Sequence, residues 1–597
     1  MTRRFLQLTG FLVLLLTCSQ TVFGQGTIRG YIKDGVSKED IIGANVLIES
    51  LGTGAAGDIN GYFSINKVPA GTYTLIINSV GYKTKKVENI QVSNNNVTEL
   101  NIFTDNESTA LNEVVITSNR LTFTEVSVLS DIKAAQQVIS GISSTQIAKS
   151  LDRNAAEVVK RIPGVTIFNE RFINIRGLNE RYNTVMLNNT FTPSMESDVR
   201  SFSFDVIPSN QIDRILVYKS PAAELPGEFA GGVVKIYSKS IPDQTSLTID
   251  LNGSYRNGTT GKEFFAPKNG SGILPLTGFN DGYNDLPSSF PSTYALKSIA
   301  VNNIQRLQQV GRSLKNTWSP VQSNALPDQR IGITGTIKTR IGKVEIGNVT
   351  AINYSNTNSF FNKTQNDFGY ANFERTQQAD VISVFNDKQY TNATRLGLLH
   401  NWAVKLNDHH VIEFKNLYNQ LSNGQFINRQ GFENGADWNI ESFNQNYRGI
   451  YTGQLMGKHD LNHGMTKVDW FGGYNQSYNQ IPDYKRFRYD ASGKLLVPTG
   501  AAQTFNLGRT NIDLNEKAFT GGININQKIM LNESGKELEI KAGGYYELKD
   551  RNFTARNLGY VQANSSLFNI GNLPIEQIFA PQNINTTTGV KIDEQTN

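Results

Sequence analysis

The sequence predicts a mainly β protein: a small β-sandwich, then an α+β unit, then part of a large antiparallel transmembrane β-barrel. Short strands with turn residues between them fill residues 26 to 104, and helix and strand patterns mix up to about residue 240. Long segments of alternating apolar and polar residues follow. The chain has 597 residues, too many for one hydrophobic core. Its mean hydropathy of −0.35 also suits a membrane barrel, whose strands alternate apolar and polar side chains.

Residues 1–24 are expected to be a secretory signal peptide. Two arginines near the N-terminus precede an apolar run from Phe11 to Leu16, and cleavage is expected before Gln25. The run is far shorter than the roughly 20 apolar residues of a membrane-spanning helix, which excludes an anchor. The single cysteine, Cys18, lies in this segment and is poorly placed for a lipoprotein site. The cleaved chain then has no thiol for a disulfide or a thiolate metal site.

Residues 25–104 are expected to form a small antiparallel β-sandwich. The turn signals Asp34-Gly35, Asn60-Gly61 and Pro69-Ala70-Gly71 separate runs that are rich in β-branched and aromatic residues. The expected strands are 27–32, 44–48, 62–65 and 72–77. No histidine precedes His400, which excludes a histidine-ligated zinc hydrolase site in this unit.

Three short stretches of this unit resemble the carboxypeptidase-regulatory-like domain. They are Gly43-Ala44-Asn45-Val46, the run from Asp58 to Phe63, and Val80-Gly81-Tyr82. The resemblance covers the whole unit, and it implies a domain that is not itself a peptidase.

Residues 105–119 are expected to form a polar linker that contains a short extended strand. Its residues are Glu113, Val114, Val115, Ile116 and Thr117. The β-branched side chains favour an extended backbone, which can add to the edge of a partner's sheet. This strand resembles the TonB box of TonB-dependent outer-membrane transporters, and the resemblance implies binding of the periplasmic TonB complex. The alternative is an ordinary edge strand of the sandwich.

Residues 120–240 are expected to form a compact α+β unit. The run from Asn154 to Glu157 is typical of a capping box, apolar residues recur at helical spacing after it, and Pro163-Gly164 ends the helix. Strands are expected at 172–176, 184–187, 212–218 and 233–237.

Two stretches of this unit resemble the plug domain of TonB-dependent outer-membrane transporters. One runs from Arg161 to Gly177 and the other from Pro226 to Ile236. The plug-motif residues are Pro163, Gly164, Arg176, Gly177, Arg214, Pro221, Gly227, Gly231 and Gly232. The chain departs from the family at Asn188-Asn189, where Asp-Gly is frequent, at Leu216, where Glu is usual, and at Ser220, where Gly is usual. The resemblance therefore implies the plug fold but not the family's ion pairs at positions 188 and 216.

Residues 241–597 are expected to be the N-terminal part of an outer-membrane β-barrel. Segments such as 247–255 and 396–404 alternate apolar and polar residues, as barrel strands of roughly ten residues do. A soluble sandwich also alternates, but polar stretches at 257–328 and 356–392 favour long extracellular loops opposite short periplasmic turns. About ten strands can be counted, against about twenty-two in the largest plugged barrels. Because an open edge is prohibitive in lipid, we expect the chain to be incomplete.

The sequence contains no constellation of catalytic residues, and the chain is not expected to be an enzyme. No cofactor or metal is expected either. His409 and His410 are neighbours in a turn, and His459 and His463 flank a hairpin without the Glu of a zinc protease. The net charge of +5 comes from scattered basic residues, which gives no indication of nucleic-acid binding.

The plug resemblance implies an outer-membrane receptor of a Gram-negative bacterium that imports an extracellular solute with energy from the TonB complex. The expected partners are this complex, outer-membrane lipids and the small solute, with a substrate-binding surface lipoprotein as an optional partner. The solute class stays open between glycans, peptides and metal chelates. The alternative function is binding or adhesion at the surface without active transport.

Overall fold

The computed structural model describes residues 25–35, 37–79, 82–104, 124–150, 152–197, 201–371, 373–531, 537–564 and 570–595. The chain divides into two compact units, Met1–Arg120 and Leu121–Asn597. In the ranges given above, no helix has the length and apolar character needed to cross a membrane.

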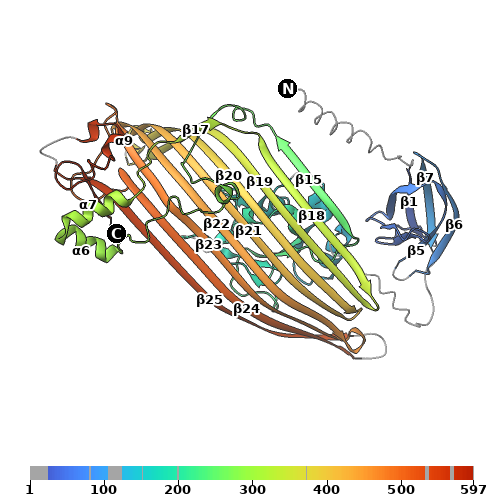
Figure 1. Cartoon of the computed structure of the whole chain (residues 1–597). Helices are drawn as coiled ribbons and strands as arrows, with labels where there is room; N and C mark the ends of the chain where they lie inside the picture. Colours follow the sequence, from blue (N-terminus) through green and yellow to red (C-terminus); the bar gives the residue numbers. More distant parts are fainter. Residues whose placement is uncertain are drawn as a thin grey trace, which may run out of the picture. The chain divides into compact units, whose positions relative to one another are not determined.

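The first unit is a sandwich of two sheets (Figure 1). Its strands are β1 (Gln25–Asp34), β2 (Asn45–Ile48), β3 (Gly54–Ala56), β4 (Tyr62–Pro69), β5 (Gly71–Asn78), β6 (Lys85–Val92) and β7 (Val97–Thr104). The sheets have the orders β4-β1-β7 and β3-β2-β5-β6, with Ile28, Phe63 and Leu75 in the shared core. The expectation of a purely antiparallel sandwich is wrong, because β1 and β7 pair in parallel. β6 and β7 lie in different sheets. After crossing between the sheets, the chain runs along β7 in the same direction as β1.

Residues 124–240 form the expected α+β unit. Its helices are α2 (Glu125–Ala134), α3 (Ser144–Ala148), α4 (Ala155–Val159), η1 (Glu180–Tyr182), η2 (Phe204–Val206) and η3 (Ser209–Gln211). Its strands are β8 (Ile139–Ser143), β9 (Val165–Phe168), β10 (Phe172–Ile175), β11 (Asn183–Leu187), β12 (Thr190–Phe191), β13 (Ile212–Tyr218) and β14 (Gly232–Ser238). The main sheet has the order β12-β11-β14-β13-β8, so β8 is an edge strand.

The N-terminus of α4 differs in one detail from the expected capping box. The Asn154 side chain accepts the Glu157 backbone N–H, as expected. The Glu157 carboxylate accepts the Arg153 backbone N–H and its guanidinium, instead of the Asn154 N–H. A neighbouring arginine therefore offers this glutamate two donors, and α4 ends at Val159, before the predicted stop at Pro163.

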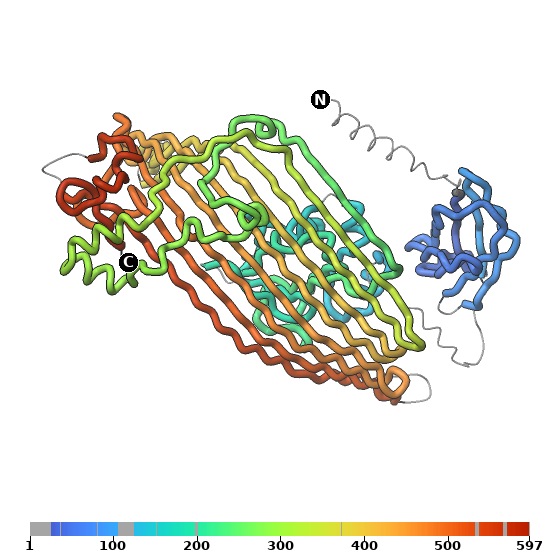
Figure 2. Tube along the Cα trace, in the orientation of Figure 1, coloured from blue at the N-terminus to red at the C-terminus, as the bar shows by residue number. Residues whose placement is uncertain are grey.

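The rest of the chain is dominated by one antiparallel sheet of ten strands, whose traces run side by side in Figure 2. The strands are β15 (Ser246–Ser254), β18 (Asp328–Ile341), β19 (Val344–Gly369), β20 (Asp380–Asn407), β21 (His410–Glu433), β22 (Ala436–Leu461), β23 (Thr466–Asp490), β24 (Leu507–Met530), β25 (Glu537–Gln562) and β26 (Val590–Glu594). They pair in this order, with β15 and β26 at the two ends.

Two expectations about this sheet are wrong. Strands β19 to β25 have 24 to 28 residues, not roughly ten. Most of the polar stretch 356–392 is not a loop, because β19 continues to Gly369 and β20 begins at Asp380. Backbone pairing continues where both faces of the sheet carry polar side chains, so the alternation that identifies a strand disappears there.

The two faces of the sheet carry different parts of the chain (Figure 1). The α+β unit packs on one face, against residues such as Leu417 and Leu421. Residues 256–327 and 570–589 pack on the opposite face, around Trp318, Tyr390 and Phe426. Their elements are β16 (Glu263–Ala266), α5 (Ile273–Leu276), α6 (Thr293–Asn302), α7 (Ile304–Ser313), β17 (Val321–Asn324), η5 (Ile570–Asn572) and α9 (Ile575–Ile578). We call the first face inner and the second outer; α8 (Phe373–Thr376) and η4 (Asn462–Gly464) lie between strands.

Candidate functional site: the contact between the α+β unit and the sheet

The α+β unit shares an apolar core with the inner face of the sheet. Six buried wall residues belong to this core: Val349, Ala351, Leu399, Leu417, Leu421 and Ile450. They pack in one cluster with side chains of the unit such as Phe204 and Ile215. No strand of the unit pairs with a strand of the wall in the described ranges, so side chains make the contact.

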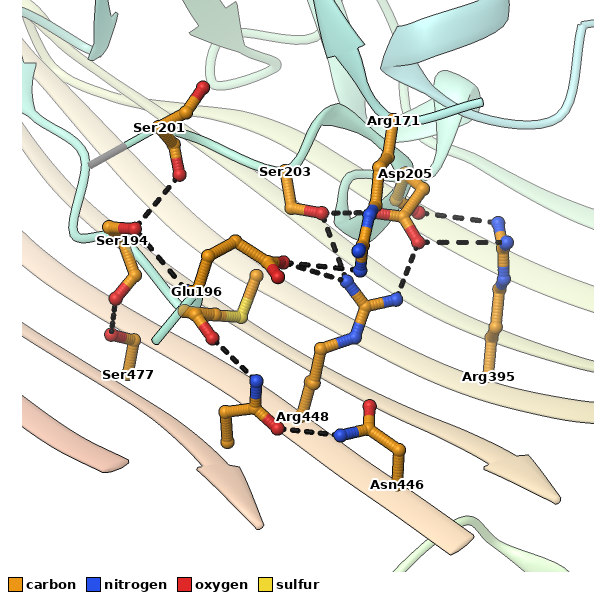
Figure 3. Close-up of polar contacts among 12 residues, drawn as sticks. Arg171, Ser194, Glu196, Ser201, Ser203, Asp205, Arg395, Asn446, Arg448 and Ser477 are labelled. Carbon is orange, nitrogen blue, oxygen red and sulfur yellow. Dashed lines mark hydrogen bonds and ion pairs between the residues drawn. The ribbon is translucent and has the colours of Figure 1, made fainter. Parts of the chain in front are cut away.

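A buried group of charges lies at the centre of the contact (Figure 3). Arg448 of β22 is only 2% exposed, and its guanidinium lies 2.8 Å from Asp205 Oδ2 and 3.4 Å from Glu196 Oε1. It also donates to Ser203 Oγ at 3.0 Å. Arg171 of the unit contacts Glu196 at 3.3 Å, while Arg395 of β20 donates to the Asp205 carbonyl at 3.2 Å. Two acids of the unit thus hold two arginines of the wall.

The arginines keep Asp205 ionised despite its burial. Burial alone would raise the pKa of this carboxyl, but Arg448, Arg395 and the Ser203 hydroxyl outweigh burial and lower the pKa to about 2. The carboxylate therefore stays charged at any physiological pH, and the ion pairs persist as long as the unit is docked.

Polar side chains of the wall bind the backbone of the unit next to these charges. The donors bind carbonyl oxygens between residues 187 and 196: Gln454 to Leu187 (3.1 Å), Asn475 to Phe191 (3.5 Å), Ser477 to Ser194 (3.3 Å) and Asn479 to Met195 (2.7 Å). Arg551 of β25 donates to the carbonyls of Ser194 and Glu196 and pairs with Glu516 at 2.7 Å. A single segment of the unit thus carries most of these bonds.

Two cavities lie between the unit and the wall, and both border the polar contacts just described: Asp205 and Arg395 line one, and Ser194 and Arg551 line the other. One of about 210 Å³ is lined by Arg153, Asn353 and Asn419 among others. The amide atoms of the buried Asn419 and the Asn353 Nδ2 have no hydrogen-bond partner in the described part of the chain. The other, of about 800 Å³, lies beside Phe191 and Tyr545. Cavities lined by polar groups of this kind commonly hold water molecules within an interface.

Several of the predicted plug-motif residues lie together in the structure. The Arg176 guanidinium donates to the carbonyls of Ala230 (3.0 Å) and Gly231 (2.8 Å), which joins the two motif stretches. Arg176, Gly177 and Gly164 all have positive φ, so the backbone bends sharply at both ends of the β9–β10 hairpin. A Cβ atom on Gly232 would lie 2.8 Å from the Tyr218 carbonyl oxygen, which only glycine avoids.

The other motif residues lie around this contact. The Pro163 carbonyl accepts Lys219 Nζ at 2.8 Å, and burial together with the charge of Arg176 lowers the pKa of that lysine. Arg214 pairs with Asp213 at 2.8 Å and lies over the Tyr237 ring. Pro221 and Gly227 lie in the connection between β13 and β14.

The positions where the chain departs from the plug pattern have other local partners. Asn188 donates to the Ser238 hydroxyl at 3.0 Å and accepts the Ser238 N–H at 2.9 Å. Leu216 is buried with Val128 and Ile139. At position 188 an amide therefore binds a hydroxyl and a backbone N–H, and at position 216 an apolar side chain packs in a small core. Neither position carries an ion pair.

Reasoning from the sequence missed the residues that dock the unit. Glu196 and Asp205 lie in a connection without periodic pattern, and Arg448 lies in the middle of a long strand. Their only signal in the sequence is the presence of charge in segments expected to face a polar wall. The expected coupling strand Glu113–Thr117 lies outside the described residues.

His410 and His459 lie opposite each other on β21 and β22, apart from this contact and on the outer face. His410 Nδ1 is 3.1 Å from His459 Nδ1, and the Trp470 indole N–H donates to His459 Nε2 at 2.9 Å. No three His, Cys, Asp or Glu side chains of the described ranges are grouped so as to hold a metal ion.

Comparisons with known families identify both units. Residues 28–116 match the CarboxypepD_reg-like domain, and residues 131–234 match the TonB-dependent Receptor Plug Domain. The chain therefore carries a CarboxypepD_reg-like domain followed by a TonB-dependent receptor plug domain. The α+β unit is the plug, and the sheet is the wall on which the plug packs. Plug domains of this kind belong to receptors rather than to enzymes, as the sequence leads us to expect.

Solved structures share parts of the fold. The ferric citrate transporter FecA is 12% identical over 77% of this chain and 67% of its own, with a TM-score of 0.32. The ferric yersiniabactin uptake receptor FyuA of Yersinia pestis is 7% identical over 72% of this chain and 65% of its own, with a TM-score of 0.35. A cohesin–X-dockerin complex of Acetivibrio cellulolyticus is 31% identical over 15% of this chain and 62% of its own, with a TM-score of 0.13. The chain thus spans about two thirds or less of these proteins. No curated protein matches it.

Proposed function

We propose that this chain is an outer-membrane receptor that imports an extracellular solute, with energy transmitted through TonB. The observation that carries the proposal is the docking of a plug, which has its own sheet, on the inner face of the strand wall. Side chains alone hold it there among the described residues, centred on Arg448, Glu196 and Asp205. The plug can therefore rearrange without breaking any backbone pairing of the wall.

The order of the plug's elements suits a pull from the N-terminal side. In this proposal TonB binds Glu113–Thr117 by adding it as a strand to its own sheet, and that bond resists force along the chain. Force then reaches α2 and β8 first. Strand β8 pairs only with β13, at the edge of the plug sheet. Peeling an edge strand breaks a few hydrogen bonds at a time, so the plug would open from this side.

The proposal includes the domain boundaries that the sequence leads us to expect. Residues 1–24 direct export and are removed, and residues 25–104 form the sandwich ahead of the linker 105–119. The plug occupies 120–240, and residues from 241 belong to the barrel wall in the outer membrane. The solute stays open between a glycan, a peptide and a metal chelate, and a surface lipoprotein remains an optional partner.

The coupling step is tested with proline in the proposed strand. Val115→Pro removes a backbone donor and disfavours the pairing, while Val115→Thr keeps a β-branched side chain. Ala110→Pro is the matched control for a proline elsewhere in the linker. We expect Val115→Pro to abolish binding of the purified TonB C-terminal domain to the full chain, with both controls at wild-type affinity.

Mass spectrometry of compounds that co-purify with the protein from its native membrane supplies the solute for the uptake assay. Val115→Pro should abolish uptake of that compound and leave its binding unchanged. If the wild type binds the compound but does not take it up, the alternative of a binding or adhesion protein without active transport replaces the proposal. If uptake continues in Val115→Pro, coupling through Glu113–Thr117 is wrong.

A further inference from the structure

A belt of aromatic side chains crosses the outer face of the wall. Strands β19 and β21 to β25 contribute one residue each: Tyr354, Tyr418, Tyr451, Tyr474, Phe519 and Tyr546. Tyr418 lies directly opposite Tyr451, and Tyr474 opposite Phe519. The rings of Tyr474 and Phe519 are 5.0 Å apart. One end of the wall has short turns, which join β18 to β19, β20 to β21 and β22 to β23. From β19 to β25 the belt moves steadily toward this end, as a line of constant height does on tilted strands.

The surface between this belt and the short turns is apolar and has the height of a bilayer core. Exposed side chains here include Ile352, Leu398, Phe414, Leu455 and Ile523. His459, beside Trp470, lies eight positions from Tyr451 on β22. Eight residues span about 27 Å along a strand. At the usual barrel tilt this gives a height of about 21 Å, close to the apolar band of roughly 25 Å in membrane barrels.

The outer face changes character directly beyond the belt. Gln420, two residues past Tyr418, is fully buried and donates to the Gly278 carbonyl at 2.7 Å. A segment of the long β15–β18 connection therefore covers the wall from the belt toward the ends of the strands that lie opposite the short turns (Figure 1). The covering segment meets the belt itself: Phe279 stacks on Tyr418 with ring centres 6.1 Å apart, and Tyr354 donates to the Leu276 carbonyl at 3.0 Å.

The part of this segment that touches the belt is the apolar turn α5. Ile273, Leu274 and Leu276 are 70%, 46% and 63% exposed. They are fixed at the belt by the two contacts of Tyr354 and Tyr418, and they continue the apolar surface of the wall. Gly272 precedes the turn with φ of 102°, which bends the chain into it.

We propose that α5 inserts Ile273, Leu274 and Leu276 among the acyl chains of the extracellular leaflet, at the border of the membrane. The proposal rests on the membrane placement of the wall proposed above. Exposed apolar side chains at the edge of a lipid-facing band are stable in the interface, where an amphipathic segment buries its apolar side about 5–10 Å deep. The turn would thus fix the height of the receptor and the position of the covering segment.

Site-specific quenching by lipids tests this placement. In the full chain with Cys18→Ala, single cysteines at Leu274→Cys, Ile352→Cys and Val301→Cys are labelled with an NBD fluorophore. The labelled proteins are reconstituted in phosphatidylcholine vesicles with bromines either near the headgroup or near the chain ends. Ile352 reports on the wall, and Val301 is an 80% exposed apolar residue of α6 in the same connection.

We expect lipids brominated near the headgroup to quench the Leu274→Cys probe at least about twofold, since the turn is shallow. Ile352→Cys should be quenched, and Val301→Cys should not. If Ile352→Cys is quenched while Leu274→Cys is not, the insertion of α5 is wrong and the membrane placement stands, whether water or protein surrounds the turn. If Ile352→Cys is not quenched, the membrane placement itself is wrong.

Discussion

Removing the charge of Asp205 should loosen the plug from the wall. Asp205→Asn keeps the size of the side chain but leaves Arg448 with only Glu196 as a charged partner, at 3.4 Å. Breaking a buried ion pair costs about 3–5 kcal/mol, because the remaining charge is uncompensated. The lowering of the Asp205 pKa from 3.8 to about 2 indicates about 2 kcal/mol from the same contacts. We therefore expect a loss of about 2–4 kcal/mol in docking free energy.

Hydrogen exchange of the detergent-solubilised full chain measures this loss. Exchange in the segment 187–205 reports its opening from the wall, and a loss of this size accelerates it about 30-fold to 1000-fold. The matched control is Glu224→Gln, because Glu224 also pairs with the wall, at 3.9 Å from Lys541, but both side chains are at least 40% exposed. An exposed pair contributes about 0–1 kcal/mol, so exchange should change less than about fivefold.

Unchanged exchange at 187–205 in Asp205→Asn would refute the reasoning, as would an equal acceleration in Glu224→Gln. The first result would mean that the apolar contacts alone hold the segment. The second would mean that any loss of negative charge on the plug weakens docking.

Two further outcomes follow from the same geometry. Because the Asp205 pKa is lowered in the docked state, its stabilisation is complete above its ordinary value of 3.8 and is lost as the pH falls toward 2. The protection factors of residues 187–197 and 201–205, which correct for the slower intrinsic exchange in acid, should fall between about pH 4 and 2 more steeply in the wild type than in Asp205→Asn. Gly232→Ala places a Cβ 2.8 Å from the Tyr218 carbonyl and should destabilise the plug by about 1–3 kcal/mol in thermal unfolding. Gly227→Ala has open space around the new Cβ and should leave the melting temperature unchanged, so equal melting of the two variants would contradict this account.

The fold class could be predicted because it depends on local patterns. Turn residues at short intervals located the sandwich, and the motif around Arg176 and Gly231 identified the plug. The lengths of the wall strands could not be predicted, because apolar and polar residues alternate mainly between the belt and the short turns, where the outer side chains are exposed. Beyond the belt of Tyr418 and Tyr451, the outer face is covered by the chain itself, and its aromatic and polar residues no longer alternate in a lipid-facing pattern.

The residues that dock the plug on the wall could not be predicted from the sequence. They are not the residues of the plug motif. Arg176 binds carbonyl oxygens within the plug, whereas Asp205 and Glu196 reach Arg448 across more than 240 positions of sequence. Such a contact depends on which strand of the wall lies beside the plug, and spacing along the chain carries no information about that.

The distribution of contacts favours local release of the plug over its ejection as a whole. Ejection would expose the six apolar wall residues of the shared core together with their partners, which costs on the order of 10 kcal/mol at 1.5–3 kcal/mol for each large side chain. Residues 187–197 and 201–205 add hydrogen bonds and ion pairs with side chains of the wall to the apolar contacts of Leu187, Met195, Phe202 and Phe204. Water can replace these partners as they separate, so the net cost of each bond is about 1 kcal/mol. A pull that peels β8 from β13 loosens the plug sheet on one side, and the charged contact at Arg448 then becomes the last strong hold of this segment. Under the proposed function, the plug would open a path along its polar side while its apolar core keeps it on the wall.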